Sequence, residues 1–304
     1  MKMLALCMFL VASVFYGTQC RAQSDWLSTP ESVAHFRDQV ESFKPASTAF
    51  ELFSVKDISV ELDGRNVAIR IYDPSDNHND SRPKPVFIYV HGACWVAGSL
   101  ESHDEVSRYL AKQSNAMVIA IDYRLAPEFK YPAGHNDVYD TVKWIWDNAA
   151  SLNIDQSKFA IGGESAGAYF AAATTLRTLQ EVNAPKIAFQ VLVFAALDGG
   201  GSSWTECKDQ YFENPEDVRS DYGSPVWAQD YASMPPTFNV FGQFEPSRAE
   251  QELFIRKLAE QGVSTRSFMV KNVGHDVVNW LQVAGDLAAH KKAIEYMNTG
   301  FGLD

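Results

Sequence analysis

Gly163-Glu164-Ser165-Ala166-Gly167 is the most informative pentapeptide of this 304-residue chain. The apolar run Phe159–Ile161 precedes it, and the small-residue run Ala168–Thr175 follows it. A strand that turns sharply into a helix at a Gly-x-Ser-x-Gly sequence is typical of a nucleophile elbow. The positions two before and two after the serine must be small, because the two backbones approach each other there. We therefore predict that Ser165 is displayed on a strained turn, with the N–H groups of the helix N-terminus directed at the group it attacks.

The rest of the chain alternates apolar strands with amphipathic helices. We predict strands at 86–90, 117–121, 159–161, 187–196, 237–241 and 266–270, and helices at 106–113, 138–152, 165–182, 250–261 and 277–297. Continuously apolar strands between helices indicate a mostly parallel central sheet with helices on both faces. A hairpin of 55–62 and 67–72 precedes them as an antiparallel edge. This α/β pattern around a nucleophile elbow predicts the α/β-hydrolase fold.

One large domain is expected. With 46% hydrophobic residues the chain can bury one large core, and we assign residues 55–304 to the hydrolase domain. Residues 23–54 have apolar positions at helical spacing and are predicted to form a small N-terminal helical cap. Residues 199–230 interrupt the alternation and are rich in Gly, Ser, Asp and Trp, so we predict a loop or lid excursion.

Residues 1–22 have the composition of a signal peptide. Lys2 supplies a positive region, Leu4–Phe15 an apolar core and Cys20-Arg21-Ala22 a cleavage pattern. We expect a secreted protein; the alternative is a protein of the ER lumen with an uncleaved N-terminal anchor. No stable membrane insertion is expected, since an apolar run of about 12 residues is shorter than the roughly 20 that span a bilayer. Asn79, in the sequon Asn79-Asp80-Ser81, is the expected glycosylation site.

Charge and cysteine content limit the partners further. The formal net charge of −12 argues against nucleic acid and anionic membranes as partners and is attributed to solubility. Cleavage after Ala22 would leave two cysteines, Cys94 and Cys207. In an oxidising compartment they permit one disulfide between the lid segment and the loop after strand 86–90; two free thiols are the alternative.

The chain order of this fold, serine then acid then histidine, selects the general base. Only His275 and His290 follow Ser165. His290 stands in a predicted helix beside two lysines, where an exposed structural role is expected. His275 follows a strand and the turn 272–274, so we predict that it takes the serine proton.

The acid that orients the base should end a strand between the serine and the histidine. Glu245 follows the strand 237–241, and its carboxylate there would accept the imidazole N–H and hold the required tautomer. Asp198, after the preceding strand, is the second candidate. The oxyanion hole is expected in the loop His91-Gly92-Ala93-Cys94-Trp95, with Ala166 supplying the remaining backbone N–H.

With these residues assigned, the chain resembles the hormone-sensitive-lipase-like α/β-hydrolases, which include carboxylesterases and arylacetamide-deacetylase relatives. Four blocks carry the resemblance in the family's order: Tyr89-Val90-His91-Gly92 with Trp95 and Gly98; Asp122-Tyr123-Arg124-Leu125-Ala126-Pro127-Glu128 with Tyr131-Pro132-Ala133; the elbow; and Ser224-Pro225 with Met234-Pro235-Pro236, Glu245-Pro246 and Gly274-His275. Together they cover about residues 60 to 300.

The resemblance implies that the N–H groups at positions 93 and 94 donate to the oxyanion. The family has glycine at both positions, where this chain has Ala93 and Cys94. A left-handed conformation at either would cost on the order of 1 kcal/mol or more. Glu245 and Glu164 replace the more usual aspartates, so both carboxylates are kept.

We therefore expect a secreted serine carboxylesterase that cleaves small to medium acyl esters through an acyl-enzyme. A small-molecule ester is the expected partner, no cofactor or metal is expected, and the oligomeric state stays open. The His-Gly-x-x-Trp loop and Ser-Ala-Gly-Ala also resemble kynurenine-formamidase-type amide hydrolases, which is one alternative. The altered oxyanion loop supports another, a weak or inactive binding protein on a hydrolase scaffold.

Overall fold

The computed structural model describes residues 26–42, 50–75, 82–281 and 288–303. The expected signal peptide and the sequon at Asn79 lie outside these ranges. Among the described helices, none combines the length and the apolar character needed to cross a bilayer.

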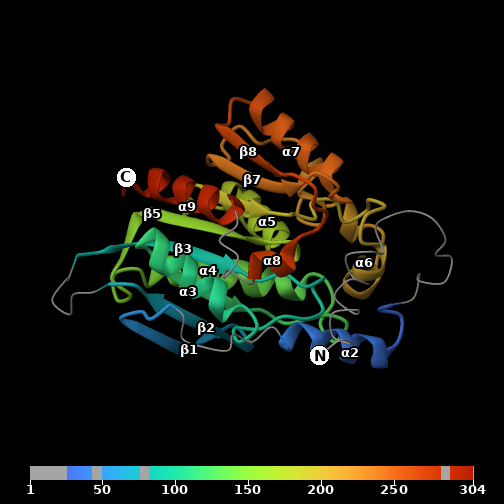
Figure 1. Cartoon of the computed structure of the whole chain (residues 1–304), viewed down its shortest axis with the longest axis horizontal. Helices are drawn as coiled ribbons and strands as arrows, with labels where there is room; N and C mark the ends of the chain where they lie inside the picture. Colours follow the sequence, from blue (N-terminus) through green and yellow to red (C-terminus); the bar gives the residue numbers. More distant parts are fainter. Residues whose placement is uncertain (1–25, 43–49, 76–81, 282–287, 304) are drawn as a thin grey trace.

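Within the described residues, eight strands form one sheet in the order β1-β2-β4-β3-β5-β6-β7-β8 (Figure 1). The strands are β1 (Ser54–Leu62), β2 (Arg65–Asp73), β3 (Lys84–Val90), β4 (Met117–Asp122), β5 (Ile154–Glu164), β6 (Gln190–Val193), β7 (Thr237–Gly242) and β8 (Thr265–Val270). β1 and β2 form the antiparallel hairpin, β2 is antiparallel to β4, and the remaining pairs are parallel. The predicted mostly parallel sheet with an antiparallel edge is confirmed.

Helices cover both faces of this sheet. The described helices are α2 (Pro30–Glu41), α3 (Asp104–Ser114), α4 (Ala133–Asp147), α5 (Ala166–Gln180), α6 (Thr205–Tyr211), α7 (Arg248–Glu260), α8 (Val277–Leu281) and α9 (Ala288–Phe301). α3, α8 and α9 lie on the near face in Figure 1, while α4, α5 and α7 pack on the other. Strand side chains alternate between the two cores: Val86 and Ile88 of β3 join the far core, and Phe87 and Tyr89 the near one.

Several element boundaries differ from those predicted. The strand expected at 187–196 is limited to Gln190–Val193, and it ends where Phe194 has a positive φ of 50°, outside the β region. The helix expected at 138–152 runs from Ala133 to Asp147. The helix expected at 277–297 is described as α8 and α9, and residues 282–287 between them lie outside the described ranges.

Two helices lie beside the loop that follows β3, at the same end of the sheet (Figure 1). In α2, Arg37 donates to the carbonyl oxygens of Val96 and Ala126, at 2.8 Å each, and pairs with Glu128. In the segment 199–230, α6 is followed by 3₁₀ turns at Asp217–Arg219 and Pro225–Trp227. Arg37 of α2 therefore holds the loop after β3 from outside the sheet.

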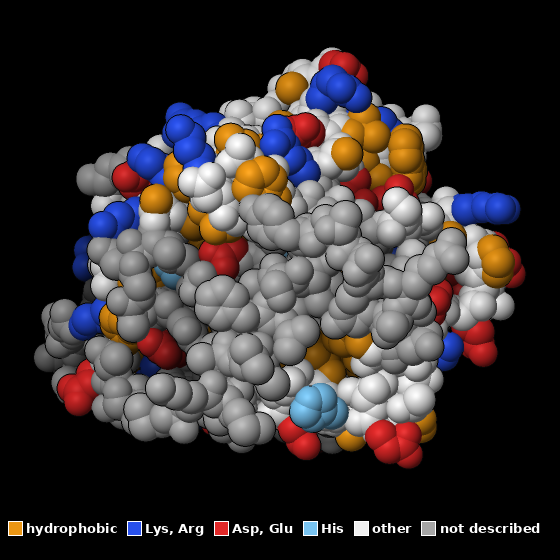
Figure 2. Space-filling model, turned by 45° about the vertical axis from the view of Figure 1, so that its right-hand side comes forward, with side chains coloured by type: hydrophobic (Ala, Val, Ile, Leu, Met, Phe, Trp, Pro, Cys, Tyr) orange, Lys and Arg blue, Asp and Glu red, His pale blue; other side chains and the backbone are white. Residues whose placement is uncertain are grey.

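Acidic and basic side chains are interspersed over the described residues of the face that Figure 2 shows.

Candidate active site

Ser165 lies at the tip of the turn between β5 and α5. Its backbone has φ 54° and ψ −119°, a strained conformation for a residue with a Cβ. A Cβ placed on Gly163 would lie 2.1 Å from the carbonyl oxygen of Val90, and one on Gly167 would lie 1.9 Å from the same oxygen. Both glycines are therefore required by the close approach of β3 to the elbow.

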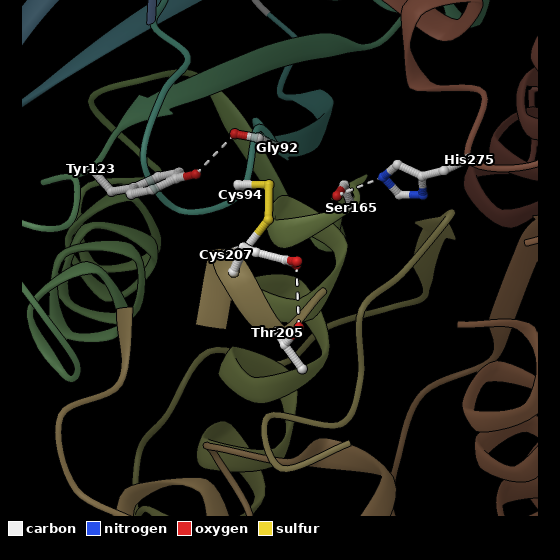
Figure 3. The surroundings of a disulfide bond; sticks show 8 residues. Gly92, Cys94, Tyr123, Ser165, Thr205, Cys207 and His275 are labelled. Atoms are coloured by element: carbon white, nitrogen blue, oxygen red, sulfur yellow. Dashed lines mark hydrogen bonds between the residues drawn. A yellow bond between two sulfur atoms is a disulfide. The ribbon is translucent and has the colours of Figure 1, made fainter. Parts of the chain in front are cut away.

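Ser165, His275 and Glu245 form a continuous hydrogen-bonded chain. His275 Nε2 lies 2.9 Å from Ser165 Oγ, and His275 Nδ1 lies 2.9 Å from Glu245 Oε1 (Figure 3 shows the serine and the histidine). Because a carboxylate only accepts, Nδ1 carries the proton and Nε2 is left to accept the serine hydroxyl. The Glu245 side chain is fully buried and also accepts a hydrogen bond from Ser247 Oγ at 2.9 Å.

The loops that carry the acid and the base are joined to each other. Glu245 follows β7 and His275 follows β8, which are neighbouring parallel strands. Phe244 N donates to the carbonyl oxygen of Val273 at 2.8 Å. This bond links the residue before the acid to a residue two positions before the base, so it fixes the distance between the two side chains.

The structure does not bring the second acid candidate to the histidine. Asp198 Oδ1 instead accepts hydrogen bonds from the Gly200 N–H at 3.0 Å and from Ser224 Oγ at 3.4 Å. Its carboxylate stabilises the start of the segment 199–230.

The expectation that His290 is exposed is wrong. His290 is fully buried, and its ring stacks on Trp280 with a centroid distance of 4.5 Å. Its Nε2 lies 2.8 Å from the Trp280 carbonyl oxygen. Helical periodicity explains the difference, since His290 faces the core beside Ala289 and Ala293, while Lys291 and Lys292 face solvent.

The oxyanion loop contains three successive residues in the left-handed region. The φ angles are 74° for Ala93, 59° for Cys94 and 59° for Trp95. Within the described part of the chain, the N–H groups of Ala93, Cys94 and Ala166 have no hydrogen-bond acceptor. Unpaired N–H groups beside the nucleophile are what an oxyanion hole requires.

A buried carboxylate, that of Glu164, holds the first residues of this loop. Glu164 is 1% exposed and accepts hydrogen bonds from the Gly92 N–H and from the Tyr89 hydroxyl. His103 Nε2 lies 2.9 Å from Glu164 Oε1. His103 was not among the residues predicted from the sequence. The one signal for it is that a buried carboxylate requires polar partners, and that signal does not indicate which residues they are.

His91 packs inside the same loop as a neutral ring. Burial, with a smaller contribution from His103, lowers the pKa of His91 to about 3. The ring stacks on Tyr123 with a centroid distance of 4.2 Å, and the Tyr123 hydroxyl donates to the His91 carbonyl oxygen at 2.9 Å. Gly98 is required here, because a Cβ on it would lie 2.4 Å from His91 Nδ1.

Cys94 and Cys207 form a disulfide that links the oxyanion loop to α6, close to Ser165 (Figure 3). Trp204, directly before α6, places its ring against the catalytic histidine candidate, with a centroid distance of 4.3 Å to His275. The segment 199–230 therefore forms part of the wall of the site. Among the described residues, no cluster of three or more His, Cys, Asp or Glu could hold a metal ion.

Comparisons with known proteins place this geometry among esterases. A profile of the alpha/beta hydrolase fold matches residues 87–279. An arylesterase of Saccharolobus solfataricus is 33% identical over 237 residues, which cover 72% of this chain and 76% of that protein. Carboxylesterase NlhH of Mycobacterium tuberculosis is 29% identical over 249 residues, covering 75% and 77%. Among solved structures, an esterase from the archaeon Pyrobaculum calidifontis superposes with a TM-score of 0.78 at 31% identity, covering 89% of this chain and 93% of that one.

Proposed function

The chain belongs to the hormone-sensitive-lipase-like α/β-hydrolases, and we propose that it is a serine carboxylesterase that works through an acyl-enzyme. One observation carries the proposal: Ser165, His275 and Glu245 are joined in series by hydrogen bonds of 2.9 Å. The similarity to proteins named arylesterase and carboxylesterase supports an ester as the substrate.

The arrangement divides the reaction into two half-reactions. In the first, His275 Nε2 removes the hydroxyl proton while Ser165 Oγ attacks the ester carbonyl, and the imidazolium then returns that proton to the leaving alcohol. In the second, His275 activates a water molecule that attacks the acyl-enzyme, and the proton passes back to Ser165 Oγ as the carboxylic acid leaves. Glu245 stabilises the imidazolium that forms in each half-reaction.

Negative charge collects on the former carbonyl oxygen in both tetrahedral intermediates. The N–H groups of Ala93, Cys94 and Ala166 are the donors proposed to stabilise it. Ala166 N–H also lies at the N-terminus of α5, where the helix dipole favours an anion.

We further propose that the protein is secreted and that its substrates are small to medium acyl esters. The signal-like segment 1–22 and the sequon at Asn79 support secretion. The Cys94–Cys207 disulfide supports it as well, since disulfides persist mainly in oxidising compartments. Expression of the full chain in eukaryotic cells should release it into the medium, with a glycosidase-sensitive mass shift that Asn79→Gln abolishes.

Turnover of p-nitrophenyl acetate and butyrate tests the activity. We expect Ser165→Ala to abolish it and to remove labelling by a fluorophosphonate probe. Ser157→Ala, at an exposed serine whose hydroxyl donates to Asp155, is the matched control and should keep both. Equal rates for wild type and Ser165→Ala would overturn the proposal, and faster cleavage of p-nitroacetanilide than of the esters would favour an amide hydrolase.

A further inference from the structure

The oxyanion loop adopts a conformation that its own residues disfavour. Ala93, Cys94 and Trp95 each have a positive φ, and each carries a Cβ that opposes this region. Internal bonds of the loop, from Val96 N and Ala97 N to the carbonyl oxygen of Ala93, close a left-handed turn. Something outside the loop must hold it, because residues with a Cβ return to the right-handed region when unrestrained.

Helix α6 contacts two of these three residues with one face. Cys207 and Tyr211 are one helical turn apart, so their side chains project in the same direction. Cys207 forms the disulfide with Cys94, and the Tyr211 ring stacks on that of Trp95 with a centroid distance of 5.4 Å and an interplanar angle of 7°. Cys207, Tyr211 and Trp95 are each at most 2% exposed, so these contacts are made in a dry interior.

The other end of α6 reaches the acid and base. Trp204 precedes its first residue and lies against His275. Ser203 Oγ donates to the carbonyl oxygen of Pro246, the residue after Glu245, at 2.9 Å. The helix therefore joins the oxyanion loop on one side of Ser165 to the loops after β7 and β8 on the other.

We propose that α6 is a brace that holds the oxyanion donors of this site, with Cys207 and Tyr211 as positioning residues. The brace takes over what glycine would otherwise supply at position 94, where a residue without a Cβ adopts a positive φ freely. The proposal rests on the proposed function, because the position of these N–H groups matters only if Ser165 creates a tetrahedral oxyanion.

Loss of the brace should affect kcat more than KM. When the turn relaxes, the N–H at position 94 rotates away from the site of developing charge, whereas substrate binding in the ground state depends little on it. Removal of a whole donor typically lowers kcat by about 10²–10³, so displacement of one should lower it by about 10- to 100-fold.

Two disulfide-free variants separate positioning from simple cross-linking. Cys207→Ser leaves residue 94 as a cysteine without its brace, whereas Cys94→Gly/Cys207→Ser gives the same position a residue that tolerates positive φ. We expect the melting temperature to fall by the same amount in both variants. The kcat of Cys207→Ser should fall by about 10- to 100-fold, and the double variant should recover most of that loss. Equal kcat values in the two variants would overturn the proposal, whether both are low or both match wild type.

A second pair of variants tests the aromatic contact and does not depend on the disulfide. Tyr211→Phe keeps the ring on Trp95 and should keep kcat. Tyr211→Leu removes the stacked ring and should lower kcat by several-fold. Equal kcat values for Tyr211→Leu and Tyr211→Phe would show that the stacked ring does not position the oxyanion loop. If Cys207→Ser does not fold, this comparison decides the proposal.

A trifluoromethyl ketone inhibitor supplies a readout that stability alone would not change. It forms a tetrahedral adduct with the serine, so its inhibition constant should rise in parallel with the fall in kcat/KM across the four variants. An unchanged inhibition constant in Cys207→Ser would show that the oxyanion donors are not displaced. A wild-type protein without Ser165-dependent turnover would instead refute the proposed function, so the two failures are distinguishable.

Discussion

The backbone N–H of Gly92, in the oxyanion loop, donates a hydrogen bond to the carboxylate of Glu164, the residue directly before the nucleophile. The base of the oxyanion loop is thereby tied to the nucleophile elbow by a single buried side chain. The same carboxylate accepts from Tyr89 of β3 and pairs with His103, the residue before α3, so groups from two segments converge on it.

Replacement of Glu164 by glutamine should disturb this junction. An amide supplies one acceptor oxygen and presents a donor to the remaining partners, so at least one buried donor loses its bond. We expect Glu164→Gln to lower kcat by roughly 10-fold and the free energy of unfolding by about 2 kcal/mol. Glu164→Asp, which keeps the charge, is the control and should retain more of both; steady-state kinetics and urea denaturation measure the two effects. A glutamine variant as active as the aspartate variant would contradict the role of the charge.

Glu245→Gln tests the choice of acid. The amide N–H₂ facing His275 Nδ1 would favour the tautomer in which Nε2 carries the proton, and that nitrogen could no longer accept from Ser165. We expect kcat for p-nitrophenyl butyrate to fall by a factor on the order of 10²–10⁴ with the fold intact. Asp198→Asn, at the second candidate, should stay within about 3-fold of wild type, since its carboxylate contacts Gly200 and Ser224. A large loss of kcat in Asp198→Asn together with a small loss in Glu245→Gln would assign the role to Asp198.

Gly92→Ala should damage the site without a change of charge. A Cβ at this position would lie 2.6 Å from the Glu164 carbonyl oxygen and 3.1 Å from Ser165 Cβ. The loop must move away from the elbow to relieve these contacts, so we expect kcat to fall by about 10²-fold. Gly200→Ala is the matched control, because the nearest atom to its Cβ would be 3.5 Å away in Val218. An active Gly92→Ala enzyme would show that the loop tolerates displacement.

His135 makes stability depend on pH in a predictable direction. Burial, with a smaller contribution from Arg177, lowers the pKa of His135 to about 3 in the folded protein, whereas an unfolded histidine titrates near 6.5. Between these values the unfolded chain binds one more proton, so this contribution to stability is present above about pH 6.5 and is lost as the pH falls toward about 3.

The variant His135→Gln isolates that contribution, since glutamine does not titrate and can still bond to the Tyr169 hydroxyl, which lies 2.8 Å from His135 Nε2. As the pH falls from about 7.5 to about 5, the free energy of unfolding of the wild type should fall by about 2 kcal/mol more than that of the variant. Urea denaturation at the two pH values measures it. A difference that is independent of pH would mean that folded His135 titrates normally.

Loss of the disulfide should lower global stability. Cys94 and Cys207 are 113 residues apart, so their bond restricts a long loop in the unfolded chain. We expect Cys94→Ala/Cys207→Ala to lose about 2–4 kcal/mol of unfolding free energy in urea. Addition of dithiothreitol should destabilise the wild type and leave the variant unchanged. Identical unfolding curves for the oxidised wild type and the variant would refute this stabilisation.

The fold and the nucleophile follow from local patterns in the sequence. Apolar alternation and helical spacing are set within a few residues, so they predict the order of strands and helices. Gly163 and Gly167 mark a turn whose sterics are equally local. The order of serine, acid and histidine leaves only His275 and His290 as bases, and of these two only His275 follows a strand.

Only the tertiary structure decided which residues from distant segments of the chain contact each other at the site. Glu245 and Asp198 both follow parallel strands, and only the bond between the loops after β7 and β8 brings one of them to His275. His103 and Tyr89 meet Glu164 through packing that no periodicity encodes.

The non-glycine residues at positions 93 and 94 illustrate the same division. The sequence showed that a left-handed conformation would be costly there, and the structure shows that the loop adopts it. Helix α6, more than 100 residues away along the chain, is the element that we propose restrains Cys94 and Trp95, because a local strain is stable only when contacts from elsewhere in the fold restrain it.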